Sequence, residues 1–451
     1  MQSPVSKSDS ILGARPELWL LGILALAAGF RSLGPFLQHT TGDSPHYVAL
    51  AMKLRTSGLD GYNLRGVRME YTSLDQSPAS DVLHLRPAKP PDGEGDLLRR
   101  LKSESSGYYD EPLHHVPYGY PILLSVLHCL DGSPPDEGWT LLHLSFKPWA
   151  LIRLRPFALA ALQWKWVLPA LIASLGVVIL TYGLGRKWFG PQAGLWAAFL
   201  VATHPVDILT AQRIWTDDAL MLALLAALWL GWRSLEKGSP TCALGAGLCF
   251  GIAYLFKPSA GIFGVAVLGA ECLRWIQCRK TPSTPAPISM RLCLLCGAGV
   301  LLATTHWFWL EWETWGTIIH QPVGREVAAA SPWHQRLLHR PPPIILYSLG
   351  LALLSPGLAL ACHQPKDRRV AWILAVAACY TLVVIAIGGR EYRYVLPVIP
   401  LMAAASGYIL EKIPGQYRAG LAIAAIGQIA WSLWLTERYA WQNWGEIMTP
   451  F

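Results

Sequence analysis

The stretch Trp164-Lys-Trp-Val-Leu-Pro-Ala-Leu-Ile-Ala-Ser-Leu-Gly-Val-Val-Ile-Leu-Thr-Tyr-Gly-Leu-Gly185 decides the class of fold. It carries a single charge, on Lys165, and the basic pair Arg186 and Lys187 follows it directly. About 20 mostly apolar residues cross a hydrocarbon core of roughly 30 Å, so this stretch is long enough to span a bilayer. Because basic joints favour the cytoplasmic side, we predict a transmembrane helix that ends inside the cell.

Similar apolar stretches recur along the whole chain. Of its 451 residues, 53% are hydrophobic and 15% are charged, whereas soluble domains carry about 25% charged residues. This composition argues against a soluble enzyme. The predicted spans cover residues 17–37, 117–130, 164–185, 191–205, 216–232, 242–256, 259–273, 292–310, 343–362, 370–387, 394–410 and 419–435. We predict an all-α polytopic membrane protein, a single membrane domain over residues 1–451 with roughly 11–13 transmembrane helices.

The charges indicate which end of the bundle faces which side. The net charge of +8 comes from short basic joints between spans, as expected for cytoplasmic loops. The long polar segments 38–116 and 311–342 then form two outer loops. The first apolar stretch has no small-residue cleavage site after it, so we expect a retained span. Successive spans must end on alternate sides of the membrane, and residues 131–163 do not fit this order. Either these residues cross or re-enter the membrane, or one short span is misassigned.

The nine cysteines all lie in apolar spans or at their ends, and none lies in the two long polar segments. A disulfide-stabilised outer domain is therefore not expected. Cys293 and Cys296 have the spacing of a zinc pair, but no second pair accompanies them, which favours core packing.

Two polar motifs adjoin the predicted outer ends of spans 1 and 2. Asp43 precedes Ser44 and Pro45, which suit the start of an amphipathic helix on the membrane surface. Asp43 is either a functional carboxylate at the bilayer surface or part of the helix cap. The second motif, before span 2, contains Asp110, Glu111, His114 and His115. These side chains either bind a divalent metal ion or are solvated loop residues.

Two further motifs place charges at the same predicted side. Asp217 and Asp218 open a long apolar helix, where they serve a reaction or satisfy the helix dipole. Lys257 stands between two spans, and Arg390 and Arg393 precede another. Cations at a membrane boundary suit phosphate, although they also act as interfacial anchors.

These motifs occur in a familiar order. The chain resembles the GT-C superfamily of glycosyltransferases that use lipid-linked sugars. It is most similar to bacterial relatives of dolichyl-phosphate-mannose protein mannosyltransferases (family 39) and to the aminoarabinose transferases. The stretches that carry the resemblance are Gly42–Tyr47, Val116–Pro121, Tyr182–Gly190 with His204-Pro205 and Trp215–Asp218, and Gly251–Pro258 with Arg393-Tyr394 and Pro397. The chain departs from the pattern where Ser44 replaces a Glu after Asp43, where Lys257 replaces an Arg, and in an extra segment over 62–106.

The resemblance implies a GT-C bundle with amphipathic juxtamembrane helices in the first outer loop, a polyprenyl-phosphate sugar donor and a lipid, protein or glycan acceptor. Asp43 would be the catalytic base, and Arg393, Arg390 and Lys257 would bind the donor phosphate. Acceptor, sugar or metal contacts would come from His46, Tyr47, Glu111, His114, His115, Tyr118, Asp217 and Asp218. A divalent ion (Mg, Mn or Zn), if used, would bind Glu111, His114 and Asp217. The implied location is a bacterial inner membrane with the active side facing the periplasm.

Two other classes compete with the glycosyltransferase. A transporter or lipid flippase would use the same membrane-boundary charges, although no inverted repeat is visible. A catalytically inactive sugar-binding or scaffold protein would explain the missing Glu after Asp43. The sequence holds no Walker motif and no Gly-x-Gly-x-x-Gly loop, which agrees with a lipid-linked donor that needs no nucleotide site.

Overall fold

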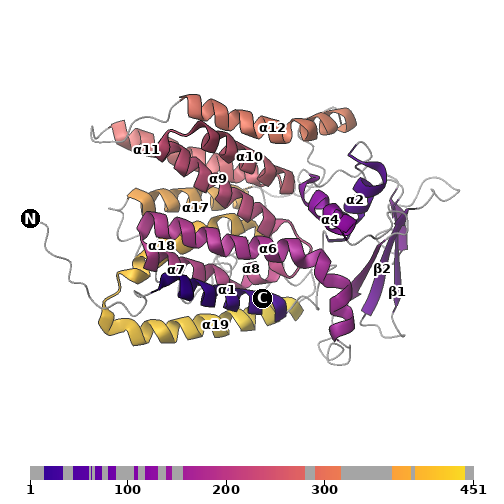
Figure 1. The fold of residues 1–451 in the computed structure, drawn as a ribbon, viewed down its shortest axis with the longest axis horizontal. Helices are drawn as coiled ribbons and strands as arrows, with labels where there is room; N and C mark the ends of the chain where they lie inside the picture. The colour runs from indigo at the N-terminus through magenta and orange to yellow at the C-terminus, as the bar shows by residue number, and fades with distance from the viewer. Residues whose placement is uncertain are drawn as a thin grey trace, which may run out of the picture.

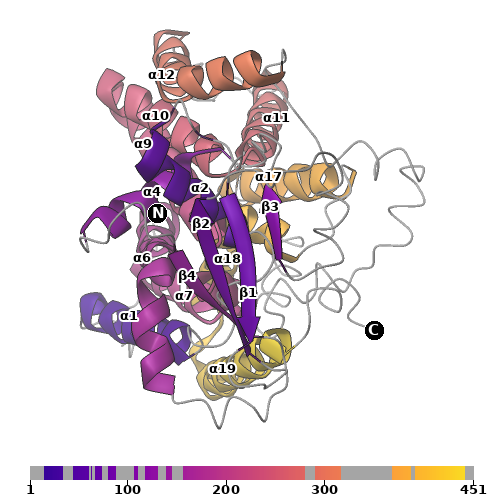
Figure 2. The same cartoon turned by 90° about the vertical axis from the view of Figure 1, so that its right-hand side faces the viewer.

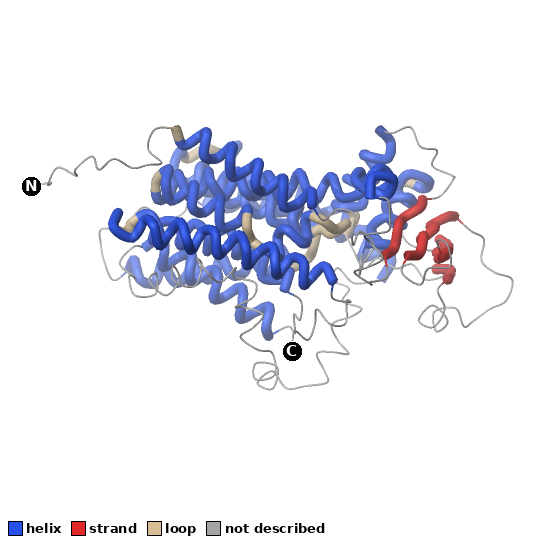
Figure 3. The backbone as a smooth tube through the Cα atoms, turned by 90° about the horizontal axis from the view of Figure 1, so that it is seen from below, coloured by secondary structure: helices blue, strands red, loops and turns tan. Residues whose placement is uncertain are grey.

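The protein is described by a computed structural model that shows a helical bundle with a small sheet beyond one end (Figure 3). The described residues are 15–33, 44–59, 62, 67–73, 80–87, 106–109, 117–130, 139–144, 156–279, 290–315, 368–386 and 392–441.

The bundle contains the membrane-spanning helices. Its elements are α1 (Pro16–Leu33), α6 (Pro156–Phe189), α7 (Pro191–Ala202), α8 (Pro205–Ala211), α9 (Asp217–Lys237), α10 (Pro240–Phe256), α11 (Ala260–Arg279), α12 (Met290–Trp315), α17 (Arg368–Ala386), η1 (Tyr392–Val398), α18 (Ile399–Glu411), η2 (Gly415–Tyr417) and α19 (Arg418–Trp441). Four helical stretches are long and apolar enough to cross a membrane, namely Trp166–Phe189, Asp217–Lys237, Met290–Glu313 and Arg393–Glu411. The bent pair α7–α8 makes a fifth if it counts as one span. Shorter apolar helices lie beside them, so the chain is an integral membrane protein.

Helix α6 runs through the middle of the bundle and packs on α7, α9 and α18 (Figure 1). On one side, α10 lies between α9 and α12. The contact between α10 and α12 is very close, because a Cβ on Gly247 would overlap the carbonyl oxygen of Cys296. Small residues allow such close approach of helices in membranes, where dispersion contacts drive association.

The sheet lies across one end of the bundle, beside the short helices α2 (Ser44–Ser57) and α4 (Gly119–Leu130) (Figure 2). Its strands are β1 (Val67–Ser73), β2 (Ser80–Pro87), β3 (Ser106–Tyr109) and β4 (Trp139–Leu144). They pair antiparallel in the order β3-β1-β2-β4. We call this end of the bundle the sheet end. The expectation of an all-α protein holds for the bundle, and this sheet is an addition that the sequence analysis did not foresee.

The predicted span over residues 117–130 is wrong. Its helix, α4, has 12 residues and is about 18 Å long, well short of a hydrocarbon core. Strand β4, which follows α4 in the chain, pairs with β2, which precedes it. The chain is therefore at the same end before and after α4. If α4 does not cross the membrane, α1 and α6 are consecutive crossings. The chain reaches the sheet end through α1 and returns through α6, whose C-terminus is basic. The conflict at residues 131–163 is thereby removed.

Helix α2 begins at Ser44, as the Ser-Pro pair predicts. It does not have the single apolar face expected of a helix lying on the membrane surface. Six consecutive residues, from Tyr47 to Met52, are buried, so the helix is covered on all sides over more than one turn. It packs against α4. The predicted span over 343–362 lies outside the described residues.

Candidate functional site

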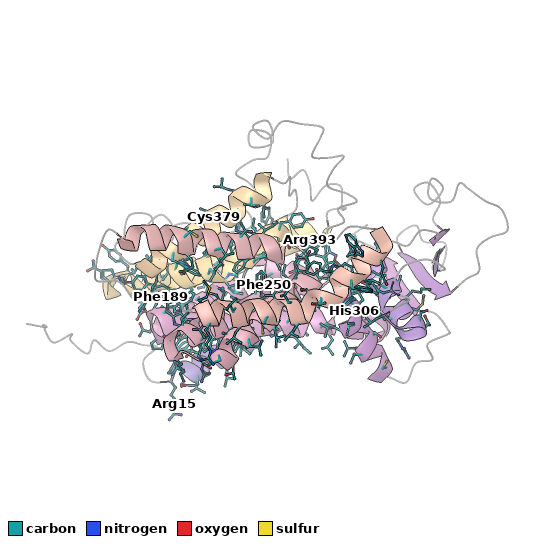
Figure 4. All side chains as sticks on the ribbon, turned by 90° about the horizontal axis from the view of Figure 1, so that it is seen from above. Arg15, Phe189, Phe250, His306, Cys379 and Arg393 are labelled. Atoms are coloured by element: carbon teal, nitrogen blue, oxygen red, sulfur yellow. The ribbon has the colours of Figure 1, made fainter. Side chains whose placement is uncertain are left out.

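The candidate site is centred on the N-terminus of α9, where Asp217 is surrounded by cations. The Nζ atom of Lys257 is 2.8 Å from Asp217 Oδ1, and Nη1 of Arg393 is 3.6 Å from Asp217 Oδ2. Asp217 and Arg393 are only 2% and 4% exposed. Figure 4 places Arg393 nearer to the sheet end than Phe189. The N-terminal dipole of α9 also favours negative charge at this position.

Lys257 owes its position to the proline that follows it. The residue before a proline is disfavoured in the α conformation, so α10 ends at Phe256. Lys257 is accordingly extended, with φ −159° and ψ 127°. Its side chain leaves the helix end toward Asp217, and its Nζ lies 4.7 Å from the centre of the Tyr394 ring. The Lys257-Pro258 pair therefore directs a cation into the site.

Trp215 provides a platform for two guanidinium groups. The Cζ atoms of Arg213 and Arg393 lie 4.4 and 4.2 Å from the centre of the Trp215 ring. Such contacts are stronger when the partners are buried, and both arginines are almost fully buried here. The indole ring of Trp215 thus holds the short connection between α8 and α9 in contact with η1.

Aromatic residues of α2 and α4 cover the other side of the α9 N-terminus. The hydroxyl of Tyr47 is 3.5 Å from Oγ1 of Thr216, and the Tyr47 ring packs edge-on against Tyr120 at 5.5 Å. Burial raises the pKa of the Tyr120 hydroxyl well above its usual value, and the nearby Asp218 and Asp217 add to this. Helix α4 can approach this closely because its first residue is Gly119. A Cβ there would lie 2.7 Å from the carbonyl oxygen of Leu255.

A second aromatic group lies between α2, α4 and α12. The Tyr62 ring packs edge-on against Tyr118 and Trp307 at 6.0 and 6.3 Å, and Tyr118 also contacts His306 at 5.7 Å. Burial raises the pKa of the Tyr62 hydroxyl well above its usual value, and the nearby Tyr47 and Glu311 add to this. Tyr62 therefore stays protonated and neutral at physiological pH.

The site gathers charges of both signs. Lys257 and Arg393 contact Asp217. Arg213 shares the Trp215 ring with Arg393. Guanidinium groups bind phosphate oxygens in a forked geometry, and a buried site strengthens each contact. The chemistry of these cations therefore suits an anionic ligand such as a phosphate group.

The structure brings together five of the predicted residues: Tyr47, Asp217, Asp218, Lys257 and Arg393. Tyr118 lies in the neighbouring aromatic group, and His46 is half-buried in α2. The other predicted site residues lie outside the described part of the chain, namely Asp43, Glu111, His114, His115 and Arg390.

The described residues do not supply a metal site by themselves. Among them, no three His, Cys, Asp or Glu side chains are grouped so that they could hold a metal ion. Asp217, one of the predicted ligands, is already engaged by Lys257 and Arg393. The other two predicted ligands, Glu111 and His114, lie outside the described residues.

No role was predicted for Arg213, Trp215 and Tyr120, which complete the site. The ion pair of Arg31 and Asp207 inside the bundle was not predicted either. For Arg31 a signal was available, since a charge within an apolar stretch such as residues 17–37 is a functional candidate by default.

Comparisons with known proteins bear on the family and on the fold of the chain. Residues 152–309, which include α6 to most of α12, match a family model described as dolichyl-phosphate-mannose-protein mannosyltransferase. Over 94 residues, or 21% of the chain, it is 32% identical to YkcB of Bacillus subtilis (strain 168), whose name assigns it provisionally to the mannosyltransferases. This match covers 13% of YkcB.

The crystal structures of ArnT from Cupriavidus metallidurans share the fold. The apo form gives a TM-score of 0.58 at 16% identity, over 90% of this chain and 62% of ArnT. The form bound to undecaprenyl phosphate gives 0.57 at 14% identity, over 95% and 70%. The chain therefore spans less than two thirds of apo ArnT.

The fold is that of a polytopic GT-C membrane protein with a cationic, carboxyl-bearing site at the sheet end. The family model over residues 152–309 and the fold shared with ArnT agree with the resemblance to the GT-C superfamily.

Proposed function

We propose that the protein transfers a sugar from a polyprenyl-phosphate donor to a hydroxyl acceptor at its sheet end. We place this end, with residues 38–116 and 311–342, on the periplasmic side of a bacterial inner membrane, because the basic joints of the chain belong to the opposite end. The acceptor is a lipid, protein or glycan hydroxyl.

One observation carries the proposal: Lys257 and Arg393 contact Asp217, and Arg213 shares the Trp215 ring with Arg393, within a fold shared with ArnT. The ArnT neighbour that was solved with undecaprenyl phosphate supports a lipid phosphate as the ligand of these cations. A polyprenyl tail can lie in the bilayer against the apolar helices around the site while its phosphate reaches the sheet end.

The reaction then proceeds by nucleophilic displacement. The acceptor oxygen attacks the anomeric carbon, and the bond between this carbon and the phosphate oxygen breaks with its electron pair going to the phosphate. The cations at Trp215 and Lys257 stabilise the charge that develops on the leaving phosphate. A carboxylate takes the proton of the acceptor hydroxyl, and Asp43 is the candidate for this role.

The remaining side chains orient the sugar and the acceptor. Tyr47 and Tyr118 supply hydroxyl groups and ring faces from α2 and the start of α4. His46 lies on the same helix as Tyr47. Asp218 opens α9 next to Asp217, and we assign it to a hydroxyl of the sugar or the acceptor. Holding the reacting groups in a fixed geometry contributes much of the rate in such transfers.

Transfer by the purified full-length chain in detergent tests the proposal. Undecaprenyl-phosphate donors carrying labelled mannose or aminoarabinose are incubated with lipid and peptide acceptors, and labelled product and free polyprenyl phosphate are measured. We expect equal amounts of both, and a loss of both in the Arg393→Met variant. If neither donor is consumed in detergent while the protein moves the same lipids between the leaflets of vesicles, the transporter alternative is correct.

A further inference from the structure

Arg31 is a fully buried arginine near the C-terminus of α1. Its Nε donates a hydrogen bond to Ser174 Oγ at 2.6 Å, and its Nη1 donates to the carbonyl oxygens of Ala202 and Ala27 at 2.9 and 3.1 Å. Its Nη2 forms an ion pair with the buried carboxylate of Asp207. One side chain therefore joins α1, α6, the end of α7 and α8.

This contact lies at the break between α7 and α8, where the chain bends by 61°. The last carbonyl groups of a helix lack intrahelical partners. Arg31 binds the Ala202 carbonyl, and the backbone N–H of Asp207 donates a hydrogen bond to Nδ1 of His204 at 3.4 Å. The side chain of Gln212 donates to the carbonyl oxygen of Phe30 at 2.9 Å. Both ends of α8 are thus fastened to the end of α1.

Asp207 is held from two sides. Besides its ion pair with Arg31, its carboxylate accepts a hydrogen bond from Ser174 Oγ of α6 at 3.0 Å. The chain runs on through α8 to Gln212, which contacts Phe30 directly before the connection to α9. This network thus fixes the start of the connection that enters the candidate site.

We propose that Arg31 and Asp207 are positioning residues for the transfer reaction: Arg31 fixes Asp207 at the break between α7 and α8, and this fixes the connection that carries Arg213 and Trp215. This inference rests on the proposed function. A buried ion pair is weak evidence for stability, because apolar replacements of similar size are often neutral or stabilising. Retention of this pair inside an apolar bundle therefore favours a role in geometry.

The test removes both charges together. Loss of Arg31 alone leaves the Asp207 charge buried without its partner and endangers folding. In the double variant R31M/D207L the helices keep apolar contacts, so folding and membrane insertion should match the wild type. We expect kcat to fall by about 100-fold, the loss that a misplacement of about 1 Å can cause, and the KM for the donor to rise as well, because Arg213 and Trp215 lie in the displaced connection. The control T181V/T304V removes two buried hydroxyls of α6 and α12 and should keep kcat.

Hydrogen exchange gives a result that does not depend on activity. Peptides covering residues 203–216 should exchange faster in R31M/D207L than in the wild type and in T181V/T304V. The variant R31K keeps the charge but not the forked geometry, so it should recover part of kcat. Unchanged exchange over 203–216, or full kcat in a well-folded double variant, would overturn the positioning role. An inactive wild type with faster exchange in the variant would instead refute the proposed reaction and leave the positioning role supported.

Discussion

Arg213 and Arg393 share one aromatic partner, with their Cζ atoms 4.4 and 4.2 Å from the centre of the Trp215 ring. The two residues belong to segments far apart in the chain, the α8–α9 connection and η1. Like charges repel, so bringing two buried guanidinium groups to one ring is costly unless acids or an anion lie nearby. Asp217 meets part of this need through Arg393. A donor phosphate at this ring would bring further negative charge to the two guanidinium groups.

Replacing the shared ring should therefore weaken donor binding. In Trp215→Leu both cation–π contacts are lost, each worth about 2 kcal/mol when desolvated, and 1.4 kcal/mol corresponds to a tenfold change in affinity. We expect the KM for a polyprenyl-phosphate sugar to rise by about tenfold or more. Trp309→Leu is the control, because Trp309 is 61% exposed on α12. Equal KM values in both variants would show that the platform does not bind the donor.

Lys257 offers a second test of the phosphate site. Lys257→Met removes a cation that lies 2.8 Å from Asp217, and loss of one preorganised group of this kind lowers kcat by about 100-fold. Lys257→Arg keeps the charge and should retain most of the rate. Lys187→Met is a matched control, since Lys187 pairs with Glu236 at 2.9 Å on the exposed surface. The rates of labelled-sugar transfer by all three variants check this, and equal losses in K257M and K187M would contradict the assignment.

Local chemistry was enough to predict part of the site. Asp217 and Asp218 were expected to open a helix, and they begin α9. Lys257 was expected between two spans, and the following proline places it there. Charges near apolar stretches are rare and costly, so sequence alone singles them out.

Contacts between distant segments were not predictable in the same way. Nothing in the residues around Trp215 indicates that Arg393 packs on it. The pairing of β4 with β2 was also missed, because short strands give weak signals and their register depends on the partner. That error made α4 a false span. Arg31 carried a readable signal as a charge within a predicted span, but neither segment shows that Arg31 and Asp207 meet.

The close contact between α4 and α10 predicts a sensitive glycine. In Gly119→Ala the added Cβ would meet the carbonyl oxygen of Leu255 at 2.7 Å, and backbone cannot move aside without moving the end of α10 and Lys257. Overpacking of this kind costs about 1–3 kcal/mol, so we expect a lower Tm and a lower rate. Gly297→Ala is the control, because nothing lies within 4 Å of a Cβ there. A scan that gives the two variants the same Tm would refute the close contact.

Asp43 is the most direct test of the proposed chemistry. In Asp43→Asn the side chain keeps its size but can no longer accept the proton of the acceptor hydroxyl. A positioned general base contributes about 100- to 10,000-fold, so kcat should fall by this factor. Expression, membrane insertion and donor KM should stay unchanged, since the donor phosphate is held by Arg213, Lys257 and Arg393 instead. Transfer at the wild-type rate in Asp43→Asn would show that another group takes the proton, and Asp218 would then be the next carboxyl group to replace.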